Sequence, residues 1–174
     1  MSIYQKLAEI GSKFVGKDIL FKYGFNFSPM YRRSTGRIMH VSQDLMDIKM
    51  KLPISYKNRN YVNTIFGGSM FAAVDPIPMV QLMELLGKEY VVWDKSAEIH
   101  FKRPANKNLY AHFSYTAEEL KALKQDIGLT NETEIIKRTA LTDKDGAIVY
   151  CEVLKTIYVA DKSYFKMKRA KTKK

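Results

Sequence analysis

One segment in the middle of the chain constrains the fold more than any other, because it is long, helical in pattern and almost wholly apolar. From Ser69 to Leu86 few positions are polar, and Gly87 follows as a stop signal. A helix with one face in water carries a polar stripe, whereas a helix that is apolar all round is buried. We therefore predict one long central helix that the rest of the domain covers.

The segments around this helix change to a period of two, which is typical of strands. Upstream, residues 37–54 (RIMHVSQDLMDIKMKLPI) predict one long or bulged strand, and residues 143–146 (DKDG) predict a hairpin turn. This order of elements predicts an α+β fold, in which one antiparallel sheet packs a central helix against one face. The alternation runs through residues 96–102 (SAEIHFK), 109–117 (LYAHFSYTA), 133–142 (TEIIKRTALT) and 147–160 (AIVYCEVLKTIYVA).

The two ends of the chain read differently from this body. Apolar residues at helical spacing in the first sixteen residues predict an amphipathic N-terminal helix that ends near Gly16. An aromatic-rich stretch, residues 19–36, predicts an irregular packed segment, and residues 118–132 predict a helical turn. We expect a single domain over residues 1–160, with an N-terminal helical extension over about 1–27, and a disordered basic tail over 161–174.

The net charge of +11 raises the question of nucleic-acid binding. Residues 162–174 hold seven Lys or Arg and no acid, which leaves +4 for the body, so the charge is mostly that of a solvated tail. We do not expect nucleic acid or a membrane surface as partner of this tail. No signal peptide is recognisable, and the single cysteine, Cys151, suits a reducing compartment, so a cytoplasmic location is expected.

The central helix opens with the pair Gly67-Gly68. Free backbone N–H groups and the positive end of the helix dipole point outward there, which suits a phosphate or the oxyanion of acyl transfer. Asp75 follows Gly68 by seven residues, which returns to nearly the same face but about 10.5 Å along the axis. If both residues serve one site, Asp75 belongs to a second copy of the chain, and this spacing predicts a dimer.

A second interpretation of Asp75 stays open. Asp-Pro is a familiar helix opening, with Asp as N-cap and Pro at the first helical position. Pro76 and Pro78 each remove one hydrogen bond of the helix, so the helix can break here. Local sequence by itself favours this capping role.

The residues Asn63, Gly67-Gly68 and Asp75 together resemble the hotdog-fold acyl-CoA thioesterases of the phenylacetate-pathway type. Over a longer pattern the chain is similar to a hotdog branch labelled as a domain of unknown function, and the resemblance covers residues 28–160. The segments that carry it are LPISYKNRNYVNTIFGG (52–68), AAVDP (72–76) and LGKEYVVWDKSAEIHFKRPA (86–105).

This resemblance implies a sheet of five or six antiparallel strands wrapped around the central helix, and homodimers that often pair into tetramers. It implies an acyl-CoA or a similar acyl thioester as substrate, with no cofactor other than the coenzyme A of that substrate and no metal. The N–H of Gly68 would polarise the thioester carbonyl, and Asp75 would act as general base or nucleophile across the dimer interface. Asn63 would help to hold water or the carbonyl.

Phe66 stands where those thioesterases have histidine. A protein that binds acyl-CoA or a fatty acyl group without catalysis is therefore the alternative function. With Gly67 and Ser69, Phe66 is predicted to line the substrate site, while Lys102 and Arg103 are predicted to contact a coenzyme A phosphate.

Other chemistries find little support in the sequence. His40, His100 and His112 occur singly, without the spacing of metal ligands, and the last two fall on polar strand faces. Cys151 has no evident base partner, which favours a packed thiol over a nucleophile. Trp93 is expected to pack in the core or in the dimer interface.

Overall fold

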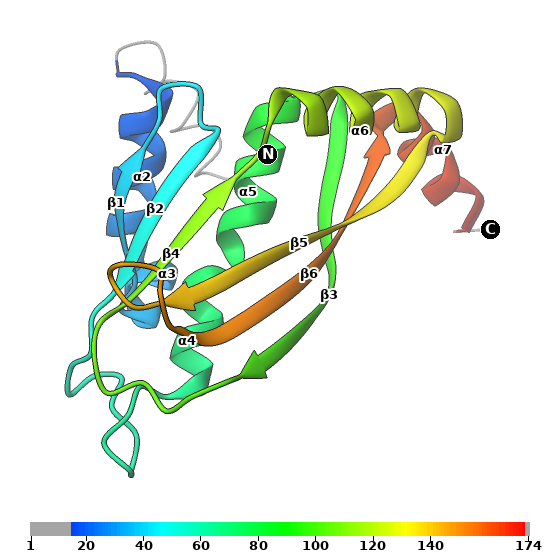
Figure 1. The fold of residues 1–174 in the computed structure, drawn as a ribbon. Helices are drawn as coiled ribbons and strands as arrows, with labels where there is room; N and C mark the ends of the chain where they lie inside the picture. The colour runs from blue at the N-terminus through cyan, green and yellow to red at the C-terminus, as the bar shows by residue number, and fades with distance from the viewer. Residues whose placement is uncertain (1–14, 173–174) are drawn as a thin grey trace.

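The structure is a computed structural model that describes residues 15–172. Its centre is a six-stranded antiparallel sheet in the order β1-β2-β4-β5-β6-β3 (Figure 1). The α+β class and the strand number both agree with the sequence analysis. The strands are β1 (Arg37–Val41), β2 (Asp47–Leu52), β3 (Tyr90–Phe101), β4 (Leu109–Ser114), β5 (Glu132–Thr142) and β6 (Val149–Asp161).

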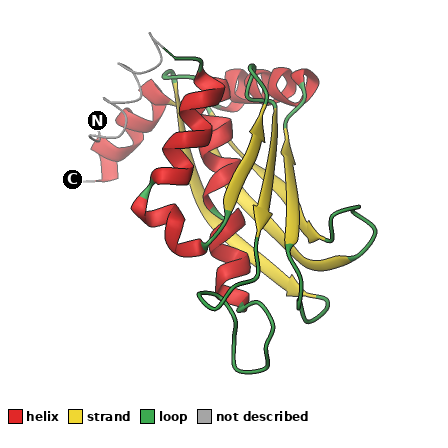
Figure 2. Ribbon diagram, turned by 90° about the vertical axis from the view of Figure 1, so that its left-hand side faces the viewer, coloured by secondary structure: helices red, strands yellow, loops and turns green. Residues whose placement is uncertain are grey.

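The central helix packs against one face of the sheet, as predicted, but it is two helices, α4 (Gly67–Val74) and α5 (Pro76–Leu86). Figure 2 shows helices gathered on one side of the strands. By length and composition alone, Gly67–Leu86 (mean hydropathy 1.2) is the one described segment that could cross a bilayer, and half of it is buried inside the domain. Its apolar character is explained by this burial, because residues such as Ala73, Ile77 and Leu82 are fully enclosed.

The break between α4 and α5 falls at Asp75, yet Asp75 is not a cap. Its backbone is helical (φ −48°, ψ −53°), and its side chain accepts no capping hydrogen bond. A capping side chain needs an extended backbone to reach the next N–H groups. The break follows instead from Pro76 and Pro78, which supply no N–H to the preceding turn.

The N-terminal region is helical up to Phe27, within the predicted helical extension, and helical again beyond it. The stretch expected to be irregular forms α2 (Lys17–Phe27) and α3 (Pro29–Ser34), and the helix expected before Gly16 lies almost wholly outside the described residues. The α2 helix covers the outer edge of the sheet, where Asn26 donates to the carbonyl of Ile38 and accepts from its N–H, each at 2.9 Å. The Asn26 side chain thereby pairs with backbone groups on the outer edge of β1, as a neighbouring strand would.

Two further predictions of element boundaries were wrong. The expected long strand over 37–54 is the hairpin β1–β2, because Ser42 and Asp44 hold a turn and Leu45 takes a left-handed conformation (φ 63°). The expected helical turn is the full helix α6 (Ala117–Thr130), which opens on a capping box between Thr116 and Glu119.

The basic C-terminal segment is helix α7 (Lys162–Thr172), not the disordered tail that was predicted. Lys168 Nζ lies 2.7 Å from both carboxylate oxygens of Glu132, and the hydroxyls of Tyr158 and Tyr164 also donate to Glu132. One acidic side chain at the start of β5 therefore contributes two contacts that hold this helix against the sheet, beside the bonds of Lys162 to the carbonyls of Lys88 and Glu89. A charge-based argument for disorder misses such a partner because Glu132 lies far away in the sequence.

Candidate active site

The amino end of α4 presents unpaired backbone donors, as the glycine pair predicted. The N–H groups of Ser69 and Met70 donate to the carbonyl of Phe66, at 2.9 and 3.2 Å. The N–H groups of Gly67 and Gly68 have no hydrogen-bond partner among residues 15–172, and Gly68 is exposed. These are donors free to meet an acceptor from outside the chain.

Both glycines lie close to aromatic rings. A Cβ on Gly67 would lie 2.7 Å from the ring of Phe101, and a Cβ on Gly68 would overlap the ring of Phe66. The two rings remain more than half exposed, at 58% for Phe66 and 57% for Phe101. The free N–H groups therefore lie beside two exposed apolar surfaces.

Asp75 is held by a lysine that sequence reasoning did not identify. Lys155 Nζ donates to Asp75 Oδ1, to the Asp75 carbonyl at 2.9 Å and to Asp94 Oδ2 at 2.7 Å. Only 3% of the Lys155 side chain is exposed, against 37% for Asp75. The other oxygen, Asp75 Oδ2, accepts no hydrogen bond from any residue that the structure describes. One oxygen is anchored and the other is free.

Asp94 is the second carboxylate on Lys155. Burial raises the pKa of Asp94, the hydrogen bond and charge of Lys155 lower it, and the charge of Asp75 raises it, with a net upward direction. When ionised, the cluster of Asp75, Lys155 and Asp94 carries one net negative charge. The lysine therefore does not neutralise both acids.

A signal for Lys155 was present in the sequence. The period-two pattern of residues 147–160 places Lys155 on the same face as Val153 and Ile157, and a lysine on an apolar strand face needs a buried partner. Asp94 carried no such signal, because the β3 residues around it are exposed and the strand has a bulge between Asp94 and Ser96.

A single chain does not bring every predicted site residue together. Gly68 and Asp75 lie at opposite ends of α4 and make no contact. Asn63 lies at the exposed tip of a turn (φ 62°), where the side chain of Asn60, not that of Asn63, makes the hydrogen bonds that hold the loop. Asn63 also makes no contact with Asp75.

Lys102 and Arg103 lie just past the end of β3, and both backbone N–H groups donate to the carbonyl of Tyr150. The Lys102 amine pairs with Glu152 at 3.3 Å, and Arg138 pairs with the same carboxylate; Arg138 and then Lys102 hold the pKa of Glu152 below its ordinary value. Arg103 is exposed, with no side-chain partner among residues 15–172. Of the two predicted phosphate contacts, Arg103 is the uncommitted one.

Two of the histidines and the cysteine lie in the surroundings that the sequence analysis expected. His100 and His112 are about half exposed and lie beside Glu98 and Asp47. Cys151 is fully buried, and burial raises the pKa of its thiol to about 11, so the thiol stays protonated at neutral pH. Within the described part of the chain, no group of three His, Cys, Asp or Glu gathers that could hold a metal.

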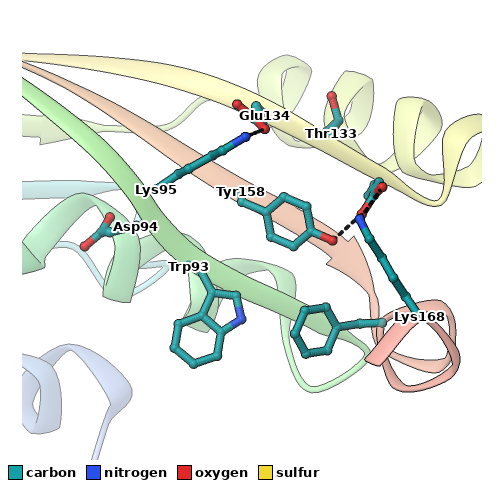
Figure 3. Close-up of a pocket in the computed structure, with 9 residues that line it drawn as sticks. Trp93, Asp94, Lys95, Thr133, Glu134, Tyr158 and Lys168 are labelled. Carbon is teal, nitrogen blue, oxygen red and sulfur yellow. Dashed lines mark hydrogen bonds and ion pairs between the residues drawn. The ribbon is translucent and has the colours of Figure 1, made fainter. Parts of the chain in front are cut away.

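A hollow lies beside α7, between that helix and the strands β3, β5 and β6, and Asp94 is one of the residues that line it (Figure 3). It has a volume of about 820 Å³ and is lined by Trp93, Tyr158 and Phe165 together with charged residues. Its two lysines pair with glutamates, Lys95 with Glu134 and Lys168 with Glu132. Trp93, 55% exposed, lines this hollow and is not part of the core.

The far edge of the sheet is open. Residues 93–98 of β3 are exposed at every position, which includes both faces of the strand. In contrast with β1, no side chain covers this edge among residues 15–172. A twelve-residue strand with an unpaired edge is a ready template for pairing with another strand.

Comparison with solved structures identifies the fold. A protein of unknown function from Pseudomonas aeruginosa, described as a "Probable Thioesterase", superposes with a TM-score of 0.72 at 18% identity, covering 82% of this chain and 95% of that one. A thioesterase from Haemophilus influenzae gives a TM-score of 0.58 at 12% identity, covering 82% and 90%. A protein of unknown function from Chlorobaculum tepidum gives 0.63 at 14%, covering 91% and 94%. The fold is therefore the thioesterase-like hotdog fold.

The family follows from the sequence itself. Residues 16–159 match the family described as "Domain of unknown function (DUF4442)", and the chain belongs to that family. The comparison with curated proteins gave no match.

Proposed function

We propose that this protein hydrolyses acyl-CoA or a related acyl thioester. The observation that carries the proposal is the difference between the two oxygens of Asp75. Lys155 donates to Oδ1, while Oδ2 has no partner among the described residues and belongs to a partly exposed carboxylate. A general base needs an accessible, oriented oxygen of this kind. The free N–H of Gly68 supplies the complementary part, a donor for a developing oxyanion.

The two parts would meet across a two-fold axis. Seven residues separate Gly68 from Asp75, about 10.5 Å along a helix, so one chain cannot aim both at a single carbonyl group. Two antiparallel copies of α4 would place Gly68 of each chain against Asp75 of the other, which gives two sites per dimer. The open edge of β3 supports such pairing, since two β3 strands side by side would close it.

The reaction can be written with these groups. The thioester oxygen would accept a hydrogen bond from the N–H of Gly68, and Asp75 Oδ2 would take a proton from water as the water oxygen attacks the carbonyl carbon. The carbon–sulfur bond would then break, and the proton would pass from Asp75 to the leaving thiolate. Direct attack by Asp75 to give a mixed anhydride is the variant of this scheme. Arg103 is free to contact a coenzyme A phosphate.

A non-catalytic acyl-binding function is the second candidate, and Phe66 favours it. Its ring lies over Gly68 at the position where the phenylacetate-pathway thioesterases have histidine, and with Phe101 it gives the site an apolar rim. Such a rim suits an acyl chain whether or not the thioester is cleaved.

Thiol release from a panel of acyl-CoAs of increasing chain length separates the two functions. Hydrolysis predicts release at a rate that depends on chain length and is lost in Asp75→Asn. Saturable binding of the same acyl-CoAs with no release from any of them would contradict the catalytic proposal and support the second.

A further inference from the structure

Lys155 is the least expected side chain of the inner sheet face. Removal of an ammonium group from water is costly, and a buried lysine keeps its charge only if oxygen atoms replace the water. Lys155 has three such oxygens, two from Asp75 and one from Asp94. The centre of the Phe71 ring lies 5.9 Å from Nζ, and the ring adds an aromatic face.

The two acids reach the lysine from separate elements. Asp75 comes from the junction of α4 and α5, and Asp94 comes from the bulge of β3, at the open edge of the sheet. Bulges change the direction of side chains and are frequent beside active sites. Lys155 thus ties the helix junction to the strand that we expect to pair with a second copy.

The shared lysine has a consequence for the reactivity of Asp75. An aspartate paired alone with a lysine is a weak base, because the positive charge favours its ionised form. Asp94 accepts from the same ammonium group and contributes a negative charge beside Asp75. The negative charge of Asp94 opposes the stabilisation of ionised Asp75 by the lysine.

We propose that Lys155 and Asp94 are positioning residues for Asp75. Lys155 fixes Oδ1 so that Oδ2 is directed to the substrate, and Asp94 offsets enough of the lysine charge to leave Asp75 able to accept a proton. This inference rests on the hydrolase function proposed above, and it assigns roles to two residues to which the resemblance gave none.

The other charged and titratable groups around the cluster are already committed. Lys137 of β5 lies directly across from Lys155 in the strand register, but its amine is 3.1 Å from Glu119 of α6 and 4.2 Å from the ring centre of Tyr115. The hydroxyl of Tyr115, the residue after β4, donates to the carbonyl of Pro78 in α5. Lys137 therefore serves as a matched control, since it is a nearby lysine on the same face with no contact to Asp75.

The kinetic test compares Asp94→Asn with Lys155→Met, because the two changes have opposite electrostatic effects on Asp75. Asp94→Asn keeps an oxygen that can accept from Lys155 and removes the negative charge. The acid limb of the pH profile of kcat/KM, where activity is lost as Asp75 takes up a proton, should therefore move to lower pH. Lys155→Met should move that limb to higher pH and lower kcat at least tenfold, since positioning is lost as well. The double variant should lie between the two, and Lys137→Met should leave the limb in place.

A second readout does not need catalysis. Carbon-13 NMR titration of the Asp94 carboxyl in the free protein should show its pKa raised further in Lys155→Met and lowered in Asp75→Asn. These shifts without any thiol release from acyl-CoA in the wild type would overturn the hydrolase function and leave Lys155 as a shared counter-ion only.

The positioning role would be overturned if Asp94→Asn and Lys155→Met moved the acid limb in the same direction, or if neither moved it, in proteins with native spectra. If Lys155→Met does not fold, Asp94→Asn decides by itself. A limb that stays in place or moves to higher pH in Asp94→Asn contradicts the proposal.

Discussion

Asp75 combines two roles that usually belong to different residues. Its Oδ1 takes part in a nearly buried ion pair, while its Oδ2 is free on a side chain that is about one-third exposed. Loss of the Asp75 side chain would leave the buried Lys155 with Asp94 as its remaining carboxylate partner, which destabilises the folded protein. A test of the reactive oxygen must therefore leave the ion-pair geometry in place.

The substitution Asp75→Asn meets that condition. Its amide oxygen can still accept from Lys155, so we expect the fold and the oligomer to be kept, although the loss of charge will lower stability. Removal of the basic oxygen should reduce turnover by on the order of 10²-fold or more, the scale of general-base catalysis. Steady-state thiol release, with circular dichroism as the control for folding, measures both effects. Turnover within a few-fold of the wild type would exclude Asp75 as base.

Among single residues, the sequence predicted the free N–H donors of Gly67 and Gly68 better than the surroundings of Asp75. A helix N-terminus opened by two glycines leaves N–H groups free by local geometry, and the structure confirms this for Gly67 and Gly68. The environment of Asp75 depends on Lys155, eighty residues later, and no local pattern encodes that contact. The Asp-Pro pair therefore suggested a cap, whereas the helical backbone at Asp75 excludes one.

Among the elements, α7 is held in part by a cluster of polar contacts around one acid, Glu132. Glu132 accepts hydrogen bonds from Lys168, Tyr158 and Tyr164, and Lys168 and then Tyr158 hold its pKa below the ordinary value. For a group whose pKa is lowered in the folded state, the stabilisation is present above the unfolded pKa, about 4.3, and is lost as the pH falls through the folded value. The docking of α7 should therefore be weaker in acid than at neutral pH.

The substitution Glu132→Gln should reproduce this acid effect at neutral pH. We expect faster hydrogen exchange of the backbone amides of residues 162–172, with the amides of β6 before Asp161 little changed, because an amide side chain cannot hold the lysine charge. Glu134→Gln, on the same strand with Lys95 as partner, is the matched control. Equal exchange of α7 in the wild type and in Glu132→Gln would show that other contacts hold the helix.

Helices and strands could be predicted where apolar residues follow one clear period, and not where the period is interrupted. Alternation identified β4, β5 and β6, and the apolar run identified α4 and α5. The turn between β1 and β2 has no glycine and contains the buried Leu45, so it read as a continuing strand. The sequence contains the signals of α6, which are the capping box from Thr116 to Glu119 and the helical spacing of apolar residues that follows it.

For the whole molecule, the two edges of the sheet differ in a way that favours assembly. Asn26 closes the β1 edge, whereas the β3 edge is open along residues that are exposed on both faces. The resemblance to hotdog thioesterases and the spacing of Gly68 and Asp75 lead to the same expectation, a dimer in which each site draws on two chains. Neither the contact between chains nor its register can be derived from one sequence, because both depend on the fit of two surfaces.

Complementation between two inactive variants tests this shared site most directly. Gly68→Pro removes the proposed oxyanion donor and Asp75→Asn removes the proposed base, and each variant is first shown by light scattering to be folded with at least twice the chain mass of 20.1 kDa. In a mixed dimer, one of the two sites would combine the intact Gly68 of one chain with the intact Asp75 of the other. Co-expressed, doubly tagged and purified heterodimers should then regain about half of the wild-type turnover per dimer, while each parent stays inactive. Confirmed heterodimers as inactive as their parents, or a wild-type protein that is monomeric at micromolar concentration, would contradict a site built from two chains.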